Sequence, residues 1–442
     1  KKINNFAIFI GANEEIAEKK LINFANYLII LMPVLLITGP LLSDSAVFII
    51  VFIFLYLTFK NKNFQIFNNK FFIFLLIFNI YISLRSLFTD EIFFSLKSSL
   101  FYFRFLILIF AVYFFLENNK KIIKYFSLSI FFTLIILCAD ALFQYVFGFN
   151  TFGFEIQNID KINSFFGDES VLGSYLIRFL PLFLACFLFY FGENKKKTFV
   201  ILVFFVGLVI FISGSRSSLA LFCLFTVLLT FLMTDYRKYF LTLILISLSF
   251  LTILIIYFNF EKIEKKDYFE NKLKYKIYYN LINPIQSTFL DNINPKNEKK
   301  IIFTHIHDSH YKTAYKMYKE NKVFGVGNKM YRKLCDKPEY YVNNYSCTTH
   351  PHNTYIQILA ENGIIGFISI LIVFSYLIYI LIKESYSRYF NKKVFLSNVS
   401  LIILVGIFVN IWPIIPSGNF YNNWNSNLLY FPVGFYLFFK KF

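Results

Sequence analysis

The residue types best suited to acid–base chemistry stand together where a long apolar run begins. The sequence reads His350-Pro-His352-Asn353 and continues as an apolar stretch from Thr354. An asparagine at such a junction can cap a helix, so we expect Asn353 to begin one there. A neutral imidazole at the junction can take a proton from a hydroxyl near neutral pH. His352 is therefore the candidate general base.

Basic side chains in or beside the apolar runs form a second group of candidates. Four lie inside runs and one follows Gly214-Ser215 where a run begins: Arg85, Lys97, Arg104, Arg178 and Arg216. Ionisable residues inside a membrane span are costly and are functional candidates by default. Their positions favour an anion site for a phosphate-bearing ligand, which suits the forked guanidinium of arginine. The alternative is that they snorkel to the interface or bind helix carbonyls, and Arg216 can also be a simple interface anchor.

The other histidines carry less information. His305, His307 and His310 lie in the same long polar segment as His350, and we interpret these three as solvated loop residues. A His-x-His pair with a third histidine is a plausible set of metal ligands. The spacing matches no strong zinc signature, and no cluster of Asp and Glu accompanies it, so we predict no metal site.

Two of the five cysteines lie in this polar segment. Cys335 and Cys347 can form a disulfide if the segment lies outside the cytoplasm, and free thiols or metal ligands are the alternatives. Cys138, Cys186 and Cys223 lie in apolar runs, where they are most simply small core residues.

The composition indicates that these residues belong to a membrane protein. The 442 residues have a mean hydropathy of +0.58, and 57% of them are hydrophobic, including 63 Phe. Apolar runs long enough to cross a bilayer as helices recur along the chain, and no cleavable signal peptide is predicted after the first. A β-barrel would show short alternating segments instead. We therefore expect an all-α, polytopic membrane protein.

The apolar runs predict about twelve transmembrane helices. Their expected ranges are 23–41, 44–59, 71–88, 92–116, 125–147, 171–191, 198–213, 216–234, 239–258, 354–382, 395–415 and 427–439. A large polar segment, 259–353, separates the ninth from the tenth. Within it, residues 308–320 show the spacing of a helix, and a turn at Gly325-Val-Gly327 follows.

The distribution of Lys and Arg predicts how these helices are oriented. Alternate short loops and both ends of the chain carry nearly all of these residues, whereas the other short loops hold only Lys161 and Arg216. This asymmetry places both termini in the cytoplasm. The segment 259–353 then lies on the outer side, which is the periplasm in a Gram-negative cell. Because orientation accounts for the net charge of +18, we predict no nucleic-acid partner.

Several motifs, in order along the chain, resemble those of one family. They are Asp140-x3-Gln144-x3-Gly148, Gly214-Ser-Arg-Ser217, Phe324-Gly-Val-Gly327, His352-Asn353 with Gly363-x-x-Gly366 nine residues later, and Pro416-Ser-Gly-Asn419. Together they are similar to the O-antigen ligase and O-antigen polymerase superfamily of bacterial envelope glycosyltransferases. The resemblance covers nearly the whole chain, so it implies one integral membrane domain, 1–442, in the bacterial inner membrane.

The resemblance implies a metal-independent transferase without a cofactor. Its donor would be a glycan on undecaprenyl diphosphate, presented among the membrane lipids. Its acceptor would be a sugar hydroxyl, either of lipid A–core or of a second lipid-linked glycan. In this scheme His352 activates the acceptor hydroxyl at the periplasmic face, and Arg216 stabilises the diphosphate leaving group as its charge develops.

The same resemblance implies supporting roles for other residues. The candidates for binding diphosphate or glycan are Arg178, Arg104, Lys161 and Asn353, and the structural glycines are Gly325, Gly327, Gly363 and Gly366. Lys161 stands where the family often has a basic residue before a short loop that contains Phe-Gly. Lysine lacks the fork of arginine, which argues against bidentate phosphate contact at this position.

Three functions are compatible with these residues. An O-antigen ligase is favoured by the intact spacing between His352 and Gly363, but an O-antigen polymerase shares the same motifs. A transporter of lipid-linked glycans would also need cations in the membrane. Transporters often contain internal repeats and helices broken at mid-membrane, and we identify neither in the sequence.

Overall fold

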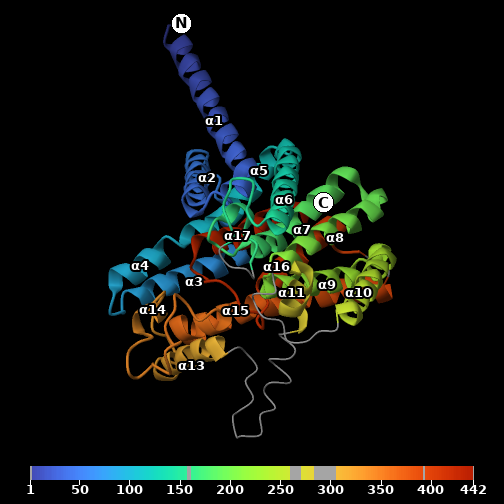
Figure 1. Ribbon diagram of the computed structural model, residues 1–442. Helices are drawn as coiled ribbons and strands as arrows, with labels where there is room; N and C mark the ends of the chain where they lie inside the picture. Colours follow the sequence, from blue (N-terminus) through green and yellow to red (C-terminus); the bar gives the residue numbers. More distant parts are fainter. Residues whose placement is uncertain (1, 157–160, 259–269, 283–304, 392–393, 442) are drawn as a thin grey trace.

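The computed structural model describes residues 2–156, 161–258, 270–282, 305–391 and 394–441, which are helical and contain no strand (Figure 1). The first ten helices are α1 (Lys2–Leu35), α2 (Pro40–Lys60), α3 (Lys70–Ser86), α4 (Ile92–Leu100), α5 (Phe103–Asn118), α6 (Lys121–Phe147), α7 (Leu172–Phe191), α8 (Lys196–Ile212), α9 (Arg216–Leu232) and α10 (Arg237–Phe258). They are followed by α11 (Lys272–Ile277), α13 (His305–Glu320), α14 (Tyr331–Leu334), α15 (Thr354–Tyr386), α16 (Asn398–Asn410) and α17 (Asn423–Phe439).

Polar side chains fix where several of these helices begin. Asn69 Oδ1 accepts hydrogen bonds from the first free amides of α3, at 2.8 and 3.2 Å. Asn353, Ser397 and Asn422 cap α15, α16 and α17 in the same way. The first amides of a helix have no partner within it, and lipid offers none, so the protein must supply the acceptors.

Two helix pairs form the centre of the molecule, and a glycine lets each pair approach closely. In α16, a Cβ on Gly406 would lie 2.4 Å from Pro181 of α7. In α17, a Cβ on Gly434 would lie 2.7 Å from Val112 of α5. Small residues at such crossings let helices pack tightly in a membrane, where no hydrophobic force between helices drives them together.

Six helical segments of the described residues are long and apolar enough to cross a membrane, which indicates a multi-pass membrane protein. They are Pro40–Lys60, Ile92–Asn118, Lys121–Phe147, Leu172–Phe191, Thr234–Ile253 and Thr354–Asn391. Each of the twelve expected ranges overlaps a helix, but the number twelve is not confirmed. Helices α3, α8 and α17 have 17 residues each. At about 1.5 Å per residue they are shorter than a bilayer core of about 30 Å.

Helix α15 differs from the unbroken helix that the sequence predicts over 354–382. Its backbone leaves the helical conformation at Gly363, where φ is 62° and ψ is −163°. The prediction of unbroken spans is therefore wrong at this helix, and one of the two arguments against a transporter is lost. A lone glycine in an apolar run did not reveal the break, because a glycine within a helix is often tolerated.

The break in α15 is the docking point of the turn at residues 324–327. The amides of Val326 and Gly327 donate to the carbonyls of Ala360 and Glu361, at 2.9 and 2.7 Å. A Cβ on Gly325 would lie 2.4 Å from the backbone of Glu361, and one on Gly363 would lie 2.2 Å from the carbonyl oxygen of Val323. The backbones of the two segments thus pack directly on each other at the motif glycines. Any larger residue at these positions would hold the two backbones apart.

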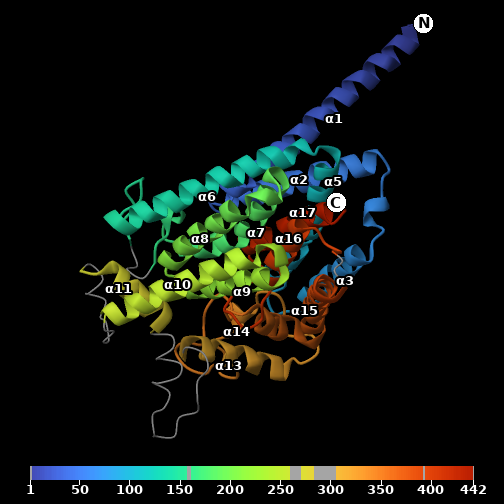
Figure 2. The same cartoon turned by 90° about the vertical axis from the view of Figure 1, so that its right-hand side faces the viewer.

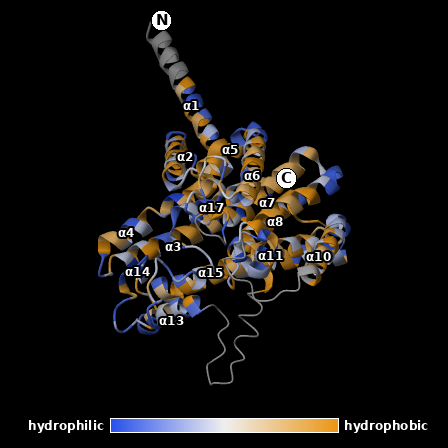
Figure 3. Cartoon of the chain, viewed as in Figure 1, coloured by the Kyte–Doolittle hydropathy of each residue, from blue (hydrophilic) through white to orange (hydrophobic). Residues whose placement is uncertain are grey.

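Residues 305–353 form a polar lobe at one end of the molecule. Both views show α13 and α14 beside α15, at the end opposite the tip of α1 (Figures 1 and 2). Figure 3 shows α13 largely in the colours of hydrophilic residues, in contrast to α7 and α8. The helix expected over 308–320 is confirmed as α13, which buries Tyr311, Ala314 and Met317.

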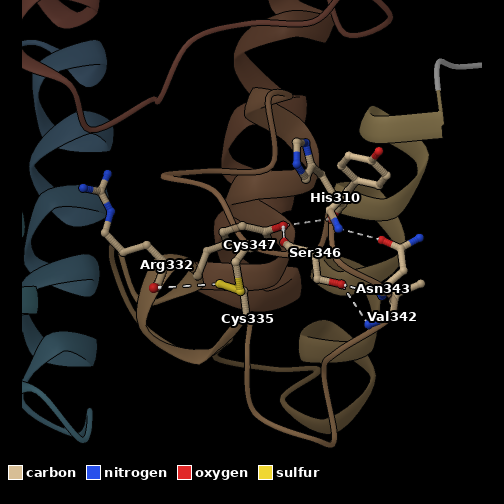
Figure 4. Close-up of a disulfide and its surroundings, with 9 residues drawn as sticks. His310, Arg332, Cys335, Val342, Asn343, Ser346 and Cys347 are labelled. Atoms are coloured by element: carbon tan, nitrogen blue, oxygen red, sulfur yellow. Dashed lines mark hydrogen bonds between the residues drawn. A yellow bond between two sulfur atoms is a disulfide. The ribbon is translucent and has the colours of Figure 1, made fainter.

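A disulfide joins Cys335 to Cys347 within this lobe (Figure 4). The segment that it closes is tied to neighbouring elements by hydrogen bonds. The Tyr331 hydroxyl donates to the carbonyl of Ser346 at 2.7 Å, and Asn343 donates to the hydroxyl of Ser309 on α13 at 2.8 Å. The bridge therefore holds the chain just before His352 against the helix that carries His310.

Replacing both Cys335 and Cys347 with serine should loosen the lobe while leaving the membrane helices folded. Removing a disulfide typically costs about 2–4 kcal/mol, and here that cost falls on the short segment between the two positions. Limited proteolysis of the purified protein should then cut within residues 336–346 at least about tenfold faster. Cys138→Ser, at a buried cysteine outside the lobe, is the control. Equal cleavage rates with and without the bridge would contradict this role.

Candidate active site

His352 occupies a strained position immediately before α15. Its φ is 57°, a left-handed conformation that non-glycine residues rarely adopt. Its carbonyl accepts a hydrogen bond from the amide of Ser417 at 2.9 Å, and the Ser417 hydroxyl accepts from the amide of Thr354 at 2.8 Å. The Pro416-Ser-Gly-Asn419 motif thus fixes the backbone on both sides of Asn353. Such strain persists only where neighbouring structure over-determines it, and it is concentrated at functional sites.

The ring of His352 lies within a cluster of four histidines. Its centroid is 4.2 Å from that of His350, 5.3 Å from His310 and 5.6 Å from His307. His310 is buried, and His307 is partly buried. The interpretation of these two as solvated loop residues is therefore wrong, because α13 turns them toward His352; His305 alone is exposed. In the described part of the chain, no three His, Cys, Asp or Glu side chains have the arrangement of a metal site.

The clustered imidazoles are neutral at physiological pH. Burial, followed by the charges of His310 and His307, lowers the pKa of His352 to about 4. Burial and the neighbouring His352 lower the pKa of His350 to about 3, although its hydrogen bond to Ser417 acts in the opposite direction. Burial also lowers the pKa of His310 and His307. A neutral His352 has a nitrogen lone pair with which to accept a proton.

Arg216 faces this cluster from a different helix. It is the first residue of α9, and its side chain is exposed. Its positive charge is the second cause, after burial, of the lowered pKa of His307. His307 is therefore a neighbour of both Arg216 and His352. Lys161 binds the turn before Arg216, since its ammonium donates to the carbonyl of Gly214 at 2.6 Å, so this turn brings two cations together.

Arg178 approaches the same region through a narrow pocket. Its guanidinium donates to Asn425 Oδ1 at 2.7 Å. The pocket is also lined by Thr354, Ser417 and Gly418, which belong to the segments that hold His352. Arg178 is thus close to the predicted base, on the side formed by the segment that follows α16.

Arg104, in contrast, belongs to a different part of the molecule. It forms an ion pair with Asp44 of α2, with the shorter nitrogen–oxygen distance at 2.6 Å. The sequence groups Arg104 with Arg178 and Arg216 as one set of candidate phosphate contacts, but the structure separates it from them. Arg85 donates to the carbonyls of Phe324 and Gly325, so it fits the alternative of binding backbone carbonyls.

Asn353 acts as the helix cap that the sequence predicts. Its Oδ1 accepts from the amides of Tyr355 and Ile356 at 3.0 and 3.1 Å, and its Nδ2 donates to the carbonyl of Pro413 at 2.7 Å. These bonds engage both ends of the amide and fix the residue next to His352. The contact with substrate that the resemblance implies for Asn353 stays a prediction.

Sequence reasoning missed two further charged residues beside the site. Glu361 is fully buried, accepts from Gln357 at 3.1 Å, and accepts from the amide of Tyr331 at 3.2 Å. Arg332 contributes to the lowered pKa of His350, and its buried Nε has no hydrogen-bond partner among the described residues. The sequence did contain a signal for Glu361, since a carboxylate in an apolar run is unusual. Arg332 gave none, because it lies in a segment rich in charge.

The site lies in a part of the chain that matches a known family. Residues 200–371 match the family model described as O-antigen ligase, and no curated protein matches the chain. The matched segment contains Arg216, the histidine cluster, and the turn and helix break that carry the motif glycines. It confirms the resemblance that the motifs suggest, because over these residues the chain is similar to the O-antigen ligase family.

Proposed function

We propose that the protein transfers a glycan from undecaprenyl diphosphate to a sugar hydroxyl. The acceptor oxygen attacks the anomeric carbon, and the bond from that carbon to the diphosphate breaks. The hydroxyl proton passes to a ring nitrogen of His352, and undecaprenyl diphosphate leaves with its charge facing Arg216. Neither residue forms a bond to the glycan, so the reaction needs one base and one fixed cation.

One observation carries this proposal: the proposed base, His352, and the proposed cation, Arg216, are both neighbours of His307. The ring centroids of His307 and His352 are 5.6 Å apart, and the charge of Arg216 contributes to the lowered pKa of His307. In a glycosyl transfer the acceptor hydroxyl needs a base and the departing diphosphate needs a cation, so the two roles fall to two separate residues. The family match over residues 200–371 supports an O-antigen ligase or polymerase type of reaction in general.

Membrane orientation is part of the proposal. About twelve spans, with both termini in the cytoplasm, would place 259–353 and the histidine cluster in the periplasm of the inner membrane. The Lys and Arg asymmetry of the short loops supports this orientation. So does the disulfide between Cys335 and Cys347, because such bonds persist in oxidising compartments.

The acceptor distinguishes the two enzymatic alternatives. In a ligase it is lipid A–core, and in a polymerase it is a second lipid-linked repeat unit; neither is expected to require a metal or cofactor. We favour the ligase, whose name the matched family model carries. Reconstitution with the lipid-linked donor, with and without lipid A–core and in the presence of a chelator, tests the assignment. Longer lipid-linked chains without lipid A–core would establish the polymerase, and donor translocation without transfer would establish a transporter.

Replacing His352 with asparagine should abolish transfer without disturbing the fold. Asparagine tolerates a positive φ better than alanine does, so the variant removes the base and keeps the backbone. The expected loss of kcat is roughly 10²–10⁴-fold, measured by sizing reaction products from reconstituted protein. His305→Asn, at the exposed histidine outside the cluster, is the matched control and should keep full activity. Near-normal transfer by His352→Asn would exclude His352 as the base.

Two replacements of Arg216 should distinguish the contribution of its positive charge from that of its forked guanidinium geometry. Arg216→Gln should lower kcat by roughly 10²–10³-fold, the cost of losing one preorganised contact to developing charge. Arg216→Lys keeps the charge but loses the fork, so it should recover only part of that loss. Full activity of the lysine variant would reduce the role of Arg216 to simple electrostatic attraction.

The pH dependence of kcat/KM tests the neutral cluster. Because burial lowers the pKa of His352 to about 4, the base form persists as the pH falls through the ordinary histidine range near 6.5. Transfer should therefore be independent of pH between about 5 and 8, with an acid limb only below about 5. His307→Gln removes one neighbouring charge and should move that limb upward. An acid limb centred near 6.5 in the unaltered protein would contradict a buried neutral base.

A further inference from the structure

A second cavity lies apart from the histidine cluster, where α2, α4 and the start of α5 meet the polar lobe. Its volume is about 770 Å³, within the range of roughly 300–1,000 Å³ that is typical of ligand pockets. The residues that matter for its chemistry are Asp44, Phe48, Lys97, Phe101, Arg104 and Lys329. They come from two segments that are long and apolar enough to cross a membrane, Pro40–Lys60 and Ile92–Asn118, and from the segment before α14.

The cavity has an excess of positive charge. Arg104 is neutralised by Asp44, which also accepts from Asn423 at 3.1 Å. The ammonium groups of Lys97 and Lys329 have no ion pair or hydrogen bond to any of the described residues. Two cations therefore remain for a ligand. Charges near low-dielectric walls attract counter-ions strongly, because the field is concentrated in the cleft.

Lys329 is held at the cavity by the motif glycines. It follows the turn at 324–327, and it has a positive φ of 58°. Burial, and then the charges of Arg332, Arg104 and Lys97, lowers the pKa of Lys329, while Glu361 acts in the opposite direction. Because the turn docks on α15, Lys329 lies close to other positively charged side chains. An anion in the cavity relieves this repulsion.

Exposed apolar side chains also line the cavity. Phe48 and Phe101 line it with 58% and 54% of their surfaces exposed, and Phe52, on the next turn of α2, is 63% exposed. These rings lie on segments that are long and apolar enough to cross a membrane. A ligand that matches both groups of side chains carries a phosphate, which binds the lysines, and a hydrocarbon chain, which packs on the phenylalanines. Cations beside membrane helices bind lipid head groups in this way.

We propose that this cavity binds the phosphate group of a membrane lipid, at a site separate from His352. The first turn of α17 contributes a residue to each of the two sites. Asn423 lines the lipid-phosphate cavity, whereas Asn425 binds Arg178 in the pocket beside Thr354. If the proposed function holds, Arg216 takes the donor diphosphate and the second cavity takes the phosphate of the acceptor lipid.

Photolabelling of the full-length protein in nanodiscs tests the binding without requiring transfer. The probes are a photoreactive phosphatidic acid, a photoreactive polyprenyl phosphate and the uncharged diacylglycerol and polyprenol counterparts. Phosphate-dependent labelling of residues 40–60 and 92–118 is the expected result, and the better phosphate probe identifies the lipid class. Lys97→Gln combined with Lys329→Gln should reduce the labelling roughly tenfold or more, since each cation near a membrane contributes about 1 kcal/mol.

The control is Lys319→Gln combined with Lys322→Gln, which removes the same charge from exposed positions on the same lobe. Labelling that ignores the phosphate, or that falls equally in both double variants, would overturn the proposal. So would displacement of the label by excess inorganic phosphate, which would assign the cavity to a soluble anion. The His352→Asn protein should label normally, so loss of transfer and loss of lipid binding are separate outcomes.

Discussion

The contact between the turn at 324–327 and the broken turn of α15 determines where every other part of the site lies. It joins a polar lobe to a membrane helix through backbone groups, and it excludes side chains from both partners. Because the contact uses main-chain hydrogen bonds at 2.7–2.9 Å, it is directional as well as close. The lobe cannot rotate on α15 without breaking these bonds, so α13 keeps its histidines over His352. The same contact sets the position of Lys329 on the other side of the turn.

The chemistry of the histidine cluster is limited by its own packing. Four imidazoles this close would repel one another if charged, and burial adds to the cost of protonation. A base with a pKa of about 4 is weak toward a sugar hydroxyl. It becomes adequate once the anomeric carbon has gained positive character and has made the incoming hydroxyl more acidic. Departure of the diphosphate therefore dominates the barrier in the proposed reaction, and the fixed cation matters more than the strength of the base.

Local patterns predicted the parts of the molecule that local forces determine. The apolar runs located the helices, and His352-Asn353 located a capped helix start, because spacing along the chain decides both. The packing of His307 and His310 on His352 depends on how α13 lies on α15, and no local pattern contains that information. The pairing of Arg104 with Asp44 is likewise a contact between two helices. This ion pair places Arg104 in a cavity apart from the predicted site.

The hydrogen bond from the amide of Ser417 to the carbonyl of His352 has a consequence for synthesis of the protein. Residue 417 is made after the helix that follows the catalytic candidates, so a ribosome has already produced α15 and α16 before this bond can form. Until then His352 lacks the partner that holds its left-handed backbone. The site is thus completed only after α16 has emerged, and a chain that is truncated or stalled before residue 417 carries the motif residues without the geometry that the proposed reaction needs.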